Sequence, residues 1–353
     1  MTAMLLPAAL VAAAVMLMLA VEDGGGRAEA AIGMQQPLKL KYQYYRRYTS
    51  CKYAEEFVKH QVTLYWNRDK TITAKLLRLL YSDCFVTGCD ASILLDGPDS
   101  EKMAHQNARL GGFDLIDKIK TVMESRCPGV VSCADILNLA TRDAVHLAGG
   151  PSYPLFTGRR DGMTSRASTV DLPSASISSK AALAYFESKT LDVLDMATLL
   201  GAHAIGTTDC SNVVDRLYNF NKTGKPDPTM SKEFADQLRK TCPPPSNMKG
   251  QQAKSPWVYL NPDSGPSYQL GNSYYKRALA YQSVLGVDQQ LLYNNDTREL
   301  TSEYGDESPW KNGFEGWRRS LTLSMNRMGN INVLTGNSTG EIRRSCRYTN
   351  QRG

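Results

Sequence analysis

Eight cysteine residues restrict the folds open to this 353-residue chain, and all of them follow residue 50. None has the Cys-x-x-Cys or paired Cys/His spacing that is typical of a zinc site. An even number of cysteines behind an apolar leader indicates a disulfide framework, which forms in an oxidising compartment. Counting alone leaves the pairing open. The cysteines are Cys51, Cys84, Cys89, Cys127, Cys133, Cys210, Cys242 and Cys346.

An apolar leader opens the chain. Residues 3–21 carry no charge and precede the polar stretch Glu22–Arg27 and the triplet Ala28-Glu29-Ala30. The small residues of that triplet fit the cleavage rule of signal peptidase. We therefore predict a signal peptide at 1–30 and a secreted domain at 31–353, with no membrane attachment after cleavage. The alternative is a signal anchor, because the apolar run is long enough to span a bilayer and lacks a basic region before it.

The charged residues are dispersed along the chain, with a formal net charge of +6. This distribution favours solubility, and it lacks the basic runs of a nucleic-acid-binding arm. The phosphate-loop pattern G-x-x-x-x-G-K-[ST] does not occur in the sequence. Asn-x-Ser/Thr sequons fit a secretory route, although such triplets also arise by chance. They start at Asn221, Asn295 and Asn337.

Helical periodicity dominates the rest of the sequence. Apolar residues recur at helical spacing, and several runs begin at a Ser or Thr cap or end at a Pro-Gly or Gly-Gly pair. Alternating strand patterns are nearly absent, and only residues 331–341 fit a short hairpin. We therefore expect a mostly α fold, as one domain with two lobes. The expected helices span residues 50–67 (with Ser50 as cap), 71–83, 113–127, 133–148, 180–189, 192–206, 274–284 and 314–328.

His203 is the histidine best placed to hold a metal or a cofactor. His60, His105 and His146 have polar neighbours, and we interpret them as structural or surface residues. A helix over 192–206 would put His203 on one face with the apolar residues three, four and seven positions before it. Such a histidine is more often a core residue than a ligand, and a carboxylate partner would favour the ligand role. Asp288 is the candidate partner, with a helix cap as its alternative role.

The segment Leu76–Ser92 carries the other reactive side chains. Helical spacing puts Arg78 on one face with Tyr81 and Ser82, among several leucines. An arginine there is costly to bury without an anionic partner. The alternative is an arginine that reaches solvent or pairs with a carboxylate.

Oxygen donors follow directly in the same segment. Asp83, Asp90 and Ser92 lie inside or beside a short loop between two cysteines, and Gly88 permits a sharp turn that could aim backbone carbonyls inward. Hard oxygen donors in a closed loop suit Ca²⁺ better than zinc or copper. Solvated acids are the alternative interpretation.

Several motifs, all in one order, resemble the class III (secretory plant) haem peroxidases over about residues 37–350. The resemblance implies a mostly helical fold with haem b between a distal and a proximal lobe. It implies that His203 binds the iron and that Asp288 accepts the second imidazole N–H. The motifs are Arg78…Ser82-Asp83-Cys84-Phe85-Val86-x-Gly88-Cys89-Asp90-Ala91-Ser92, Cys127-Pro-Gly-Val-Val-Ser-Cys133-Ala-Asp, Gly158-Arg-Arg-Asp161 and Gly201-Ala-His203-x-Ile-Gly206.

The same resemblance implies a disulfide pairing and a distal calcium site. The implied disulfides are Cys51–Cys127, Cys84–Cys89, Cys133–Cys346 and Cys210–Cys242. The implied calcium ligands are the side chains of Asp83, Asp90 and Ser92 and the carbonyls of Val86 and Gly88, with Glu101 reaching the ion through water.

The family oxidises phenolic donors with hydrogen peroxide, and we expect a monomer in the cell wall or the vacuole. A distal histidine moves the peroxide proton, an asparagine orients that histidine, and an arginine stabilises the charge on the departing oxygen. Arg78 matches the arginine and Asn107 the asparagine. Pro173 matches the proline whose carbonyl lines the aromatic-donor site.

The distal histidine itself is absent. The family pattern R-L-H-F-H-D-C reads Arg78-Leu-Leu80-Tyr81-Ser82-Asp83-Cys84 in this chain, so that Ser82 takes the catalytic position. A serine hydroxyl is no base near neutral pH, and its short side chain could leave room for a water beside Asn107. General acid–base catalysis contributes about 10²–10⁴ in rate. We therefore expect peroxide activation to be slower by about that factor.

A second departure concerns the family's proximal calcium site. That site uses a Thr after the axial His, then Asp, Thr/Ser and Asp. When the sequence is aligned with the family pattern at Tyr274-Tyr275, the four ligand positions hold Ala204, Asp263, Pro266 and Gly271. Because only Asp263 keeps a charged ligand, we expect this site to be empty or weak. A shifted register that uses Ser264 or Ser267 is the alternative.

The sequence leaves three functions open. The first, which we favour, is a slow secreted peroxidase. The second is a haem-binding or redox-sensing protein without turnover, which Ser82 and Leu80 support. The third is a haem-free secreted interaction glycoprotein, against which His203 and Asp288 argue.

Overall fold

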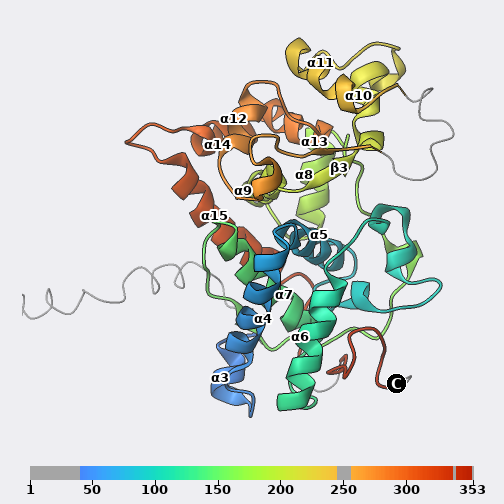
Figure 1. The fold of residues 1–353 in the computed structure, drawn as a ribbon, viewed down its shortest axis with the longest axis vertical. Helices are drawn as coiled ribbons and strands as arrows, with labels where there is room; N and C mark the ends of the chain where they lie inside the picture. Colours follow the sequence, from blue (N-terminus) through green and yellow to red (C-terminus); the bar gives the residue numbers. More distant parts are fainter. Residues whose placement is uncertain (1–39, 245–255, 337–338, 352–353) are drawn as a thin grey trace, which may run out of the picture. The chain divides into compact units, whose positions relative to one another are not determined.

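The computed structural model describes residues 40–244, 256–336 and 339–351 (Figure 1). The predicted signal peptide at 1–30 and the sequon at Asn337 lie outside these residues. No helix within the described ranges is both long enough and apolar enough to cross a membrane. The described residues are mostly helical, which confirms the predicted fold class.

A first group of helices surrounds α7 (Cys133–Leu147). Almost every residue of α7 is buried, because α4, α5 and α6 all pack against it. Ser132 caps its N-terminus by accepting a hydrogen bond from the Asp135 N–H at 3.1 Å. The other helices of this group are α3 (Tyr44–Tyr48), α4 (Ala54–Arg68), α5 (Ile72–Cys84) and α6 (Phe113–Arg126).

A second group surrounds α9 (Val193–Leu200), which packs against α8, α14 and α15. Asp192 and Asp195 form a reciprocal capping box at its start. Its other members are α8 (Ser179–Ser188), α12 (Ser273–Leu279), α13 (Gly286–Gln289), α14 (Asn295–Gly305) and α15 (Gly313–Met328). Two further helices, α10 (Val214–Tyr218) and α11 (Lys232–Thr241), contact each other.

The helix α9 ends earlier than its sequence pattern predicts. Its last turn passes into a 3₁₀ turn at Gly201–Ala204 instead of continuing to residue 206. The carbonyls exposed by this change accept hydrogen bonds from buried side chains: Ala197 O from the Tyr275 hydroxyl at 3.0 Å and Thr198 O from Trp317 Nε1 at 3.1 Å. The predicted end of this helix at residue 206 is therefore wrong, and His203 lies in the 3₁₀ turn that follows α9.

The described strands are short and antiparallel. β1 (Lys41–Tyr42) pairs with β2 (Phe156–Thr157), and β3 (Thr207–Asp209) pairs with β4 (Trp257–Tyr259). The described parts of the predicted hairpin, residues 331–336 and 339–341, do not pair with each other as strands. Leu334 and Glu341 instead pair with Arg160 and Asp161, each through an isolated bridge, so both arms of the segment bind the same distant stretch of chain.

The expected helix at 50–67 begins later than predicted, and Ser50 is not its cap. The preceding turn is fixed by Thr49, whose hydroxyl donates to Tyr45 O at 2.8 Å and accepts from the Cys51 N–H at 3.1 Å. The helix then starts at Ala54. At the other expected helices the boundaries agree closely, except that α9 ends at Leu200 rather than at 206 and α12 ends at Leu279 rather than at 284.

All four disulfides implied by the family resemblance are present. Cys51–Cys127 joins the turn before α4 to the end of α6, and Cys84–Cys89 closes the loop after α5. Cys133–Cys346 fastens the C-terminal segment to the start of α7, and Cys210–Cys242 joins the segment after β3 to the end of α11. Cys84–Cys89 therefore constrains the loop that holds the predicted calcium ligands.

Candidate active site

The proximal side of the candidate site is a histidine bound to a buried carboxylate. His203 Nδ1 lies 2.8 Å from Asp288 Oδ1, and the Tyr274 hydroxyl donates to the same oxygen at 2.9 Å. Asp288 comes from α13 and Tyr274 from α12, whereas His203 lies in the 3₁₀ turn after α9. Three separate elements therefore meet at one carboxylate oxygen.

The position of His203 depends on Gly201. A Cβ at Gly201 would lie 2.3 Å from the Tyr275 hydroxyl and 2.6 Å from Trp317 Nε1, so the turn can approach these two side chains only without one. The same two groups bind the last carbonyls of α9. The early end of the helix and the placement of the histidine thus have one cause, which is close contact with α12 and α15.

The proximal residues fit a haem. Because a carboxylate only accepts hydrogen bonds, Nδ1 of His203 is the donor in this contact, and in the neutral imidazole Nε2 then keeps its lone pair. The imidazole is 28% exposed, whereas the side chain of Asp288 is 1% exposed. The ring therefore reaches accessible space on one side while its partner is buried. A histidine that binds haem iron needs this arrangement: one ring nitrogen donates to a carboxylate, and the other is accessible to the metal.

Arg78 marks the distal side. Its Nη2 donates to Gln106 O at 3.1 Å, and its guanidinium carbon lies 5.1 Å from the centre of the Tyr81 ring. Desolvation lowers the pKa of Arg78 and raises the pKa of Tyr81 to about 12, although solvent still reaches both side chains. Groups that are surrounded by protein and yet accessible are typical of a cleft wall. No carboxylate contacts Arg78 among the described residues.

Two buried oxygens near this wall have no hydrogen-bond partner among the described residues. They are Ser82 Oγ and Asn107 Oδ1, in side chains that are 0% and 2% exposed. Asn107 donates through Nδ2 to Glu101 O at 2.9 Å, so its carbonyl oxygen is the end left free. Buried polar atoms are rarely left unpaired. Both therefore suit the binding of a small polar molecule.

The loop after α5 holds the predicted calcium ligands. Asp83 accepts the Ala91 N–H at 2.9 Å and Asp90 accepts the Ser92 N–H at 3.0 Å, so the carboxylates shape the loop themselves. Gly88 has a φ of +134°, and a Cβ there would lie 2.7 Å from Asn332 Cβ. Val86 donates its N–H to Asp83 O at 3.3 Å, which tightens the turn.

Burial makes these acids good partners for a cation. It raises the pKa of Asp83 well above its usual value, with the charge of Asp90 as a further cause, and raises the pKa of Glu101 to about 7. Glu101 is 0% exposed, and its carboxylate has the Ser92 and Ser165 hydroxyls as neighbours. No three acidic, His or Cys side chains converge on one point in those ranges. The fit to Ca²⁺ therefore rests on donor chemistry, with carbonyl and hydroxyl oxygens completing the set.

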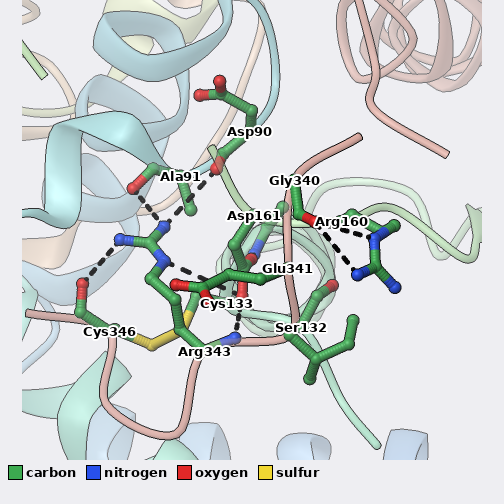
Figure 2. Close-up of polar contacts among 12 residues, drawn as sticks. Asp90, Ala91, Ser132, Cys133, Arg160, Asp161, Gly340, Glu341, Arg343 and Cys346 are labelled. Atoms are coloured by element: carbon green, nitrogen blue, oxygen red, sulfur yellow. Dashed lines mark hydrogen bonds and ion pairs between the residues drawn. A yellow bond between two sulfur atoms is a disulfide. The ribbon is translucent and has the colours of Figure 1, made fainter. Parts of the chain in front are cut away.

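A buried arginine that the sequence analysis did not select fixes this loop (Figure 2). Arg343 Nη2 donates to Ala91 O at 2.7 Å, and its Nη1 donates to Cys346 O at 2.9 Å. Its backbone N–H binds Asp161 Oδ2 at 2.9 Å. Arg343 is 0% exposed. It thus ties the C-terminal segment to the calcium loop, and no local sequence signal points to that role.

Two predicted residues remain, Asp263 and Pro173. Asp263 forms an ion pair with Arg277 at 2.9 Å, and its side chain is 49% exposed. Pro173 is half-buried in the segment before α8, two residues after Asp171, whose carboxylate accepts the Tyr185 hydroxyl at 3.3 Å. Two further residues of the site do not stand out in the sequence. Tyr274 appears there only as a point of alignment with the family, and Gln106 makes its contact through its backbone carbonyl.

The fold and the site define a mostly helical enzyme with a histidine–aspartate pair, and comparison with known proteins identifies its family. Residues 56–307 match the family described as Peroxidase. The chain is 61% identical over 323 residues to "Probable peroxidase 26" of Arabidopsis thaliana, covering 92% of this chain and 93% of the relative.

Two other Arabidopsis thaliana proteins are also similar. "Probable peroxidase 61" is 60% identical over 327 residues, which cover 93% of each chain. "Peroxidase 57" is 42% identical over 301 residues, which cover 85% of this chain and 90% of the relative. The chain therefore belongs to the peroxidase family, and it is an oxidoreductase that uses hydrogen peroxide, in a family that works with haem iron.

Proposed function

We propose that this peroxidase is secreted after removal of residues 1–30 and oxidises phenolic donors with hydrogen peroxide. The pairing of His203 Nδ1 with Asp288 Oδ1 at 2.8 Å carries the proposal, since it leaves Nε2 free to bind haem b. The bound iron would supply the site at which peroxide is reduced. Asp288 would hold the imidazole of His203, and the distal residues would orient the peroxide and its protons. Pro173 would contact the aromatic donor, and the enzyme would act as a monomer.

On the distal side, Arg78 would have one role and Ser82 and Asn107 another. The guanidinium of Arg78 provides a fixed positive charge for the oxygen that departs from peroxide. Ser82 Oγ and Asn107 Oδ1, both buried and unpaired in the described chain, would hold a water or the peroxide by hydrogen bonds. A hydroxyl and an amide orient a molecule but do not take its proton at neutral pH. The predicted outcome is turnover that is slower than with a distal histidine.

The distal loop would bind one calcium ion. The buried carboxylates of Asp83, Asp90 and Glu101 have raised pKa values, chiefly through burial, so a divalent cation would relieve the cost of their charge. Ser92 and the carbonyls of Val86 and Gly88 would provide the neutral ligands. Calcium would therefore stabilise the end of α5, which carries Arg78 and Ser82.

A second candidate function is haem binding without turnover, and the replacement at Ser82 favours it. Purified protein separates these possibilities. A Soret band with stoichiometric haem and measurable oxidation of a small phenol by hydrogen peroxide are the results expected for the peroxidase. Haem without any consumption of peroxide would favour the second function. A chain that takes up no haem would overturn both and leave an interaction glycoprotein.

A further inference from the structure

The residue that follows the candidate iron ligand is held by an amide side chain. Ala204 O accepts a hydrogen bond from Asn261 Nδ2 at 3.2 Å. The same nitrogen donates to Ser273 Oγ, the first residue of α12, at 2.8 Å. Asn261 is 2% exposed. One buried amide therefore joins the 3₁₀ turn of His203 to the helix that carries Tyr274.

In the family resemblance, this place belongs to a calcium ion that bridges the residue after the axial histidine and a downstream acidic loop. The residues of this chain do not fit such an ion. Asp263 is the only acid that the sequence places at a ligand position of this site. It forms an ion pair with Arg277 and is half-exposed. The side chain that contacts Ala204 O is Asn261, two positions earlier in the sequence.

The contact puts a hydrogen-bond donor of the protein, rather than a cation, against Ala204 O. Calcium requires about six to eight oxygen ligands. Asn261 presents its NH₂ group, whose hydrogens carry positive partial charge, toward both Ala204 O and Ser273 Oγ. The Ser264 hydroxyl bonds within its own loop, to Gln269 O at 2.9 Å. The group that approaches Ala204 O is thus a donor nitrogen of the protein, where a calcium site would place a cation.

We propose that Asn261 is a positioning residue that replaces the proximal calcium ion of the family. Its amide fastens the turn of His203 to α12 by two hydrogen bonds, so that the proximal side keeps its geometry without a metal. The chain would then bind a single calcium ion, at the distal loop. A spectroscopic test of the iron–histidine bond rests on the proposed haem site, whereas a count of bound calcium ions does not.

The calcium count tests the proposal on the native protein. After treatment with a chelator and dialysis, titration with calcium should show one tightly bound ion per chain, and the Asp90→Ala variant should bind none tightly. Two tightly bound ions in the native protein would overturn the proposal. Because this measurement needs neither haem nor a variant at residue 261, its result stands even if the proposed peroxidase function fails.

A matched pair of variants tests the positioning role. Asn261→Ala removes the contact with Ala204, and Asn326→Ala removes a comparable buried bond, from Asn326 Nδ2 to Thr322 O at 2.9 Å, within α15. Both changes should lower the melting temperature. Only Asn261→Ala should shift the iron–histidine vibrational frequency of the reduced protein, and in the native protein chelation should leave that frequency unchanged. Equal shifts in both variants, no shift in Asn261→Ala, or a shift of the native frequency on chelation would refute the role.

Discussion

Tyr274 and His203 bind the same oxygen of Asp288, at 2.9 and 2.8 Å. The two donors compete for the negative charge of one carboxylate, which is 1% exposed and so receives little help from solvent. The phenol of Tyr274 therefore limits how strongly Asp288 can draw on the imidazole N–H. Through that contact a residue that does not touch the cofactor would set the donor strength of His203.

Tyr274→Phe should lower the reduction potential of the bound iron. Without the phenol, Asp288 accepts more strongly from Nδ1, the imidazole becomes a stronger donor, and the oxidised iron is favoured. A hydrogen bond is worth about 1 kcal/mol, which corresponds to a shift of up to about 40 mV for one electron. Spectroelectrochemical titration measures it.

Tyr275→Phe is the matched control for this change. Its hydroxyl is equally buried but donates to Ala197 O at 3.0 Å rather than to Asp288. We expect Tyr275→Phe to destabilise the fold with a much smaller effect on potential. If both variants shift the potential equally, general loosening of α12 is the cause and not the shared oxygen.

Restoring the distal base should accelerate the reaction with peroxide. We expect Ser82→His to raise the second-order rate constant by roughly tenfold or more, since general base catalysis contributes about 10²–10⁴ and the pocket is not otherwise adapted. Stopped-flow mixing measures the rate. Leu80→His is the control, because it adds an imidazole at the other histidine position of the family pattern. An equal gain there, or none at Ser82, would contradict the assignment.

The dependence of the rate on pH should change with the same variant. Tyr81 cannot act as a base in the native protein, because burial raises its pKa to about 12, and Ser82 does not ionise in the accessible range. The native rate should therefore keep rising with pH as more peroxide is ionised. In Ser82→His the rate should level off above the pKa of the imidazole, ordinarily about 6.5. A native rate that levels off near neutral pH would indicate another base.

The helices and the contact between His203 and Asp288 could be predicted from the sequence. The start of α9 carries its capping box within four residues, and α6 ends just before a Pro-Gly pair. His203 and Asp288 were paired through the family motif and lie in contact in the structure. The signals that failed depend on distant residues. The segment at 331–341 has the composition of a hairpin, yet its partners are residues 160 and 161.

The contact between Asn261 and Ala204 shows the same limit at a finer scale. The sequence identifies the loss of calcium ligands, but two residues of register decide whether Asp263 or Asn261 faces the carbonyl. That choice follows from the packing of the loop between β4 and α12. The sequence pattern does not predict this packing, because the loop has no regular periodicity.

Arg343 should control both stability and calcium binding. Arg343→Ala would leave Asp161 buried without its cation and the carbonyl of Ala91 without its donor. Removing one partner of a buried pair costs about 3–5 kcal/mol, measurable as a loss of unfolding free energy in urea. Calcium affinity should fall as well, because the loop loses its anchor. Arg344→Ala, at an exposed neighbouring residue, should change neither quantity.

Gly201→Ala should disrupt the proximal side although it adds only one methyl group. The new Cβ would lie 2.3 Å from the Tyr275 hydroxyl and 2.6 Å from Trp317 Nε1, and both side chains are fully buried and bonded to the end of α9. Overpacking of this kind costs about 1–3 kcal/mol, and the displacement falls on the turn that carries His203. We therefore expect a lower melting temperature together with weaker haem retention. Gly271→Ala is the control, because its Cβ would meet no heavy atom within 4 Å. If Gly201→Ala keeps native stability and haem content, close contact at this glycine does not position the histidine.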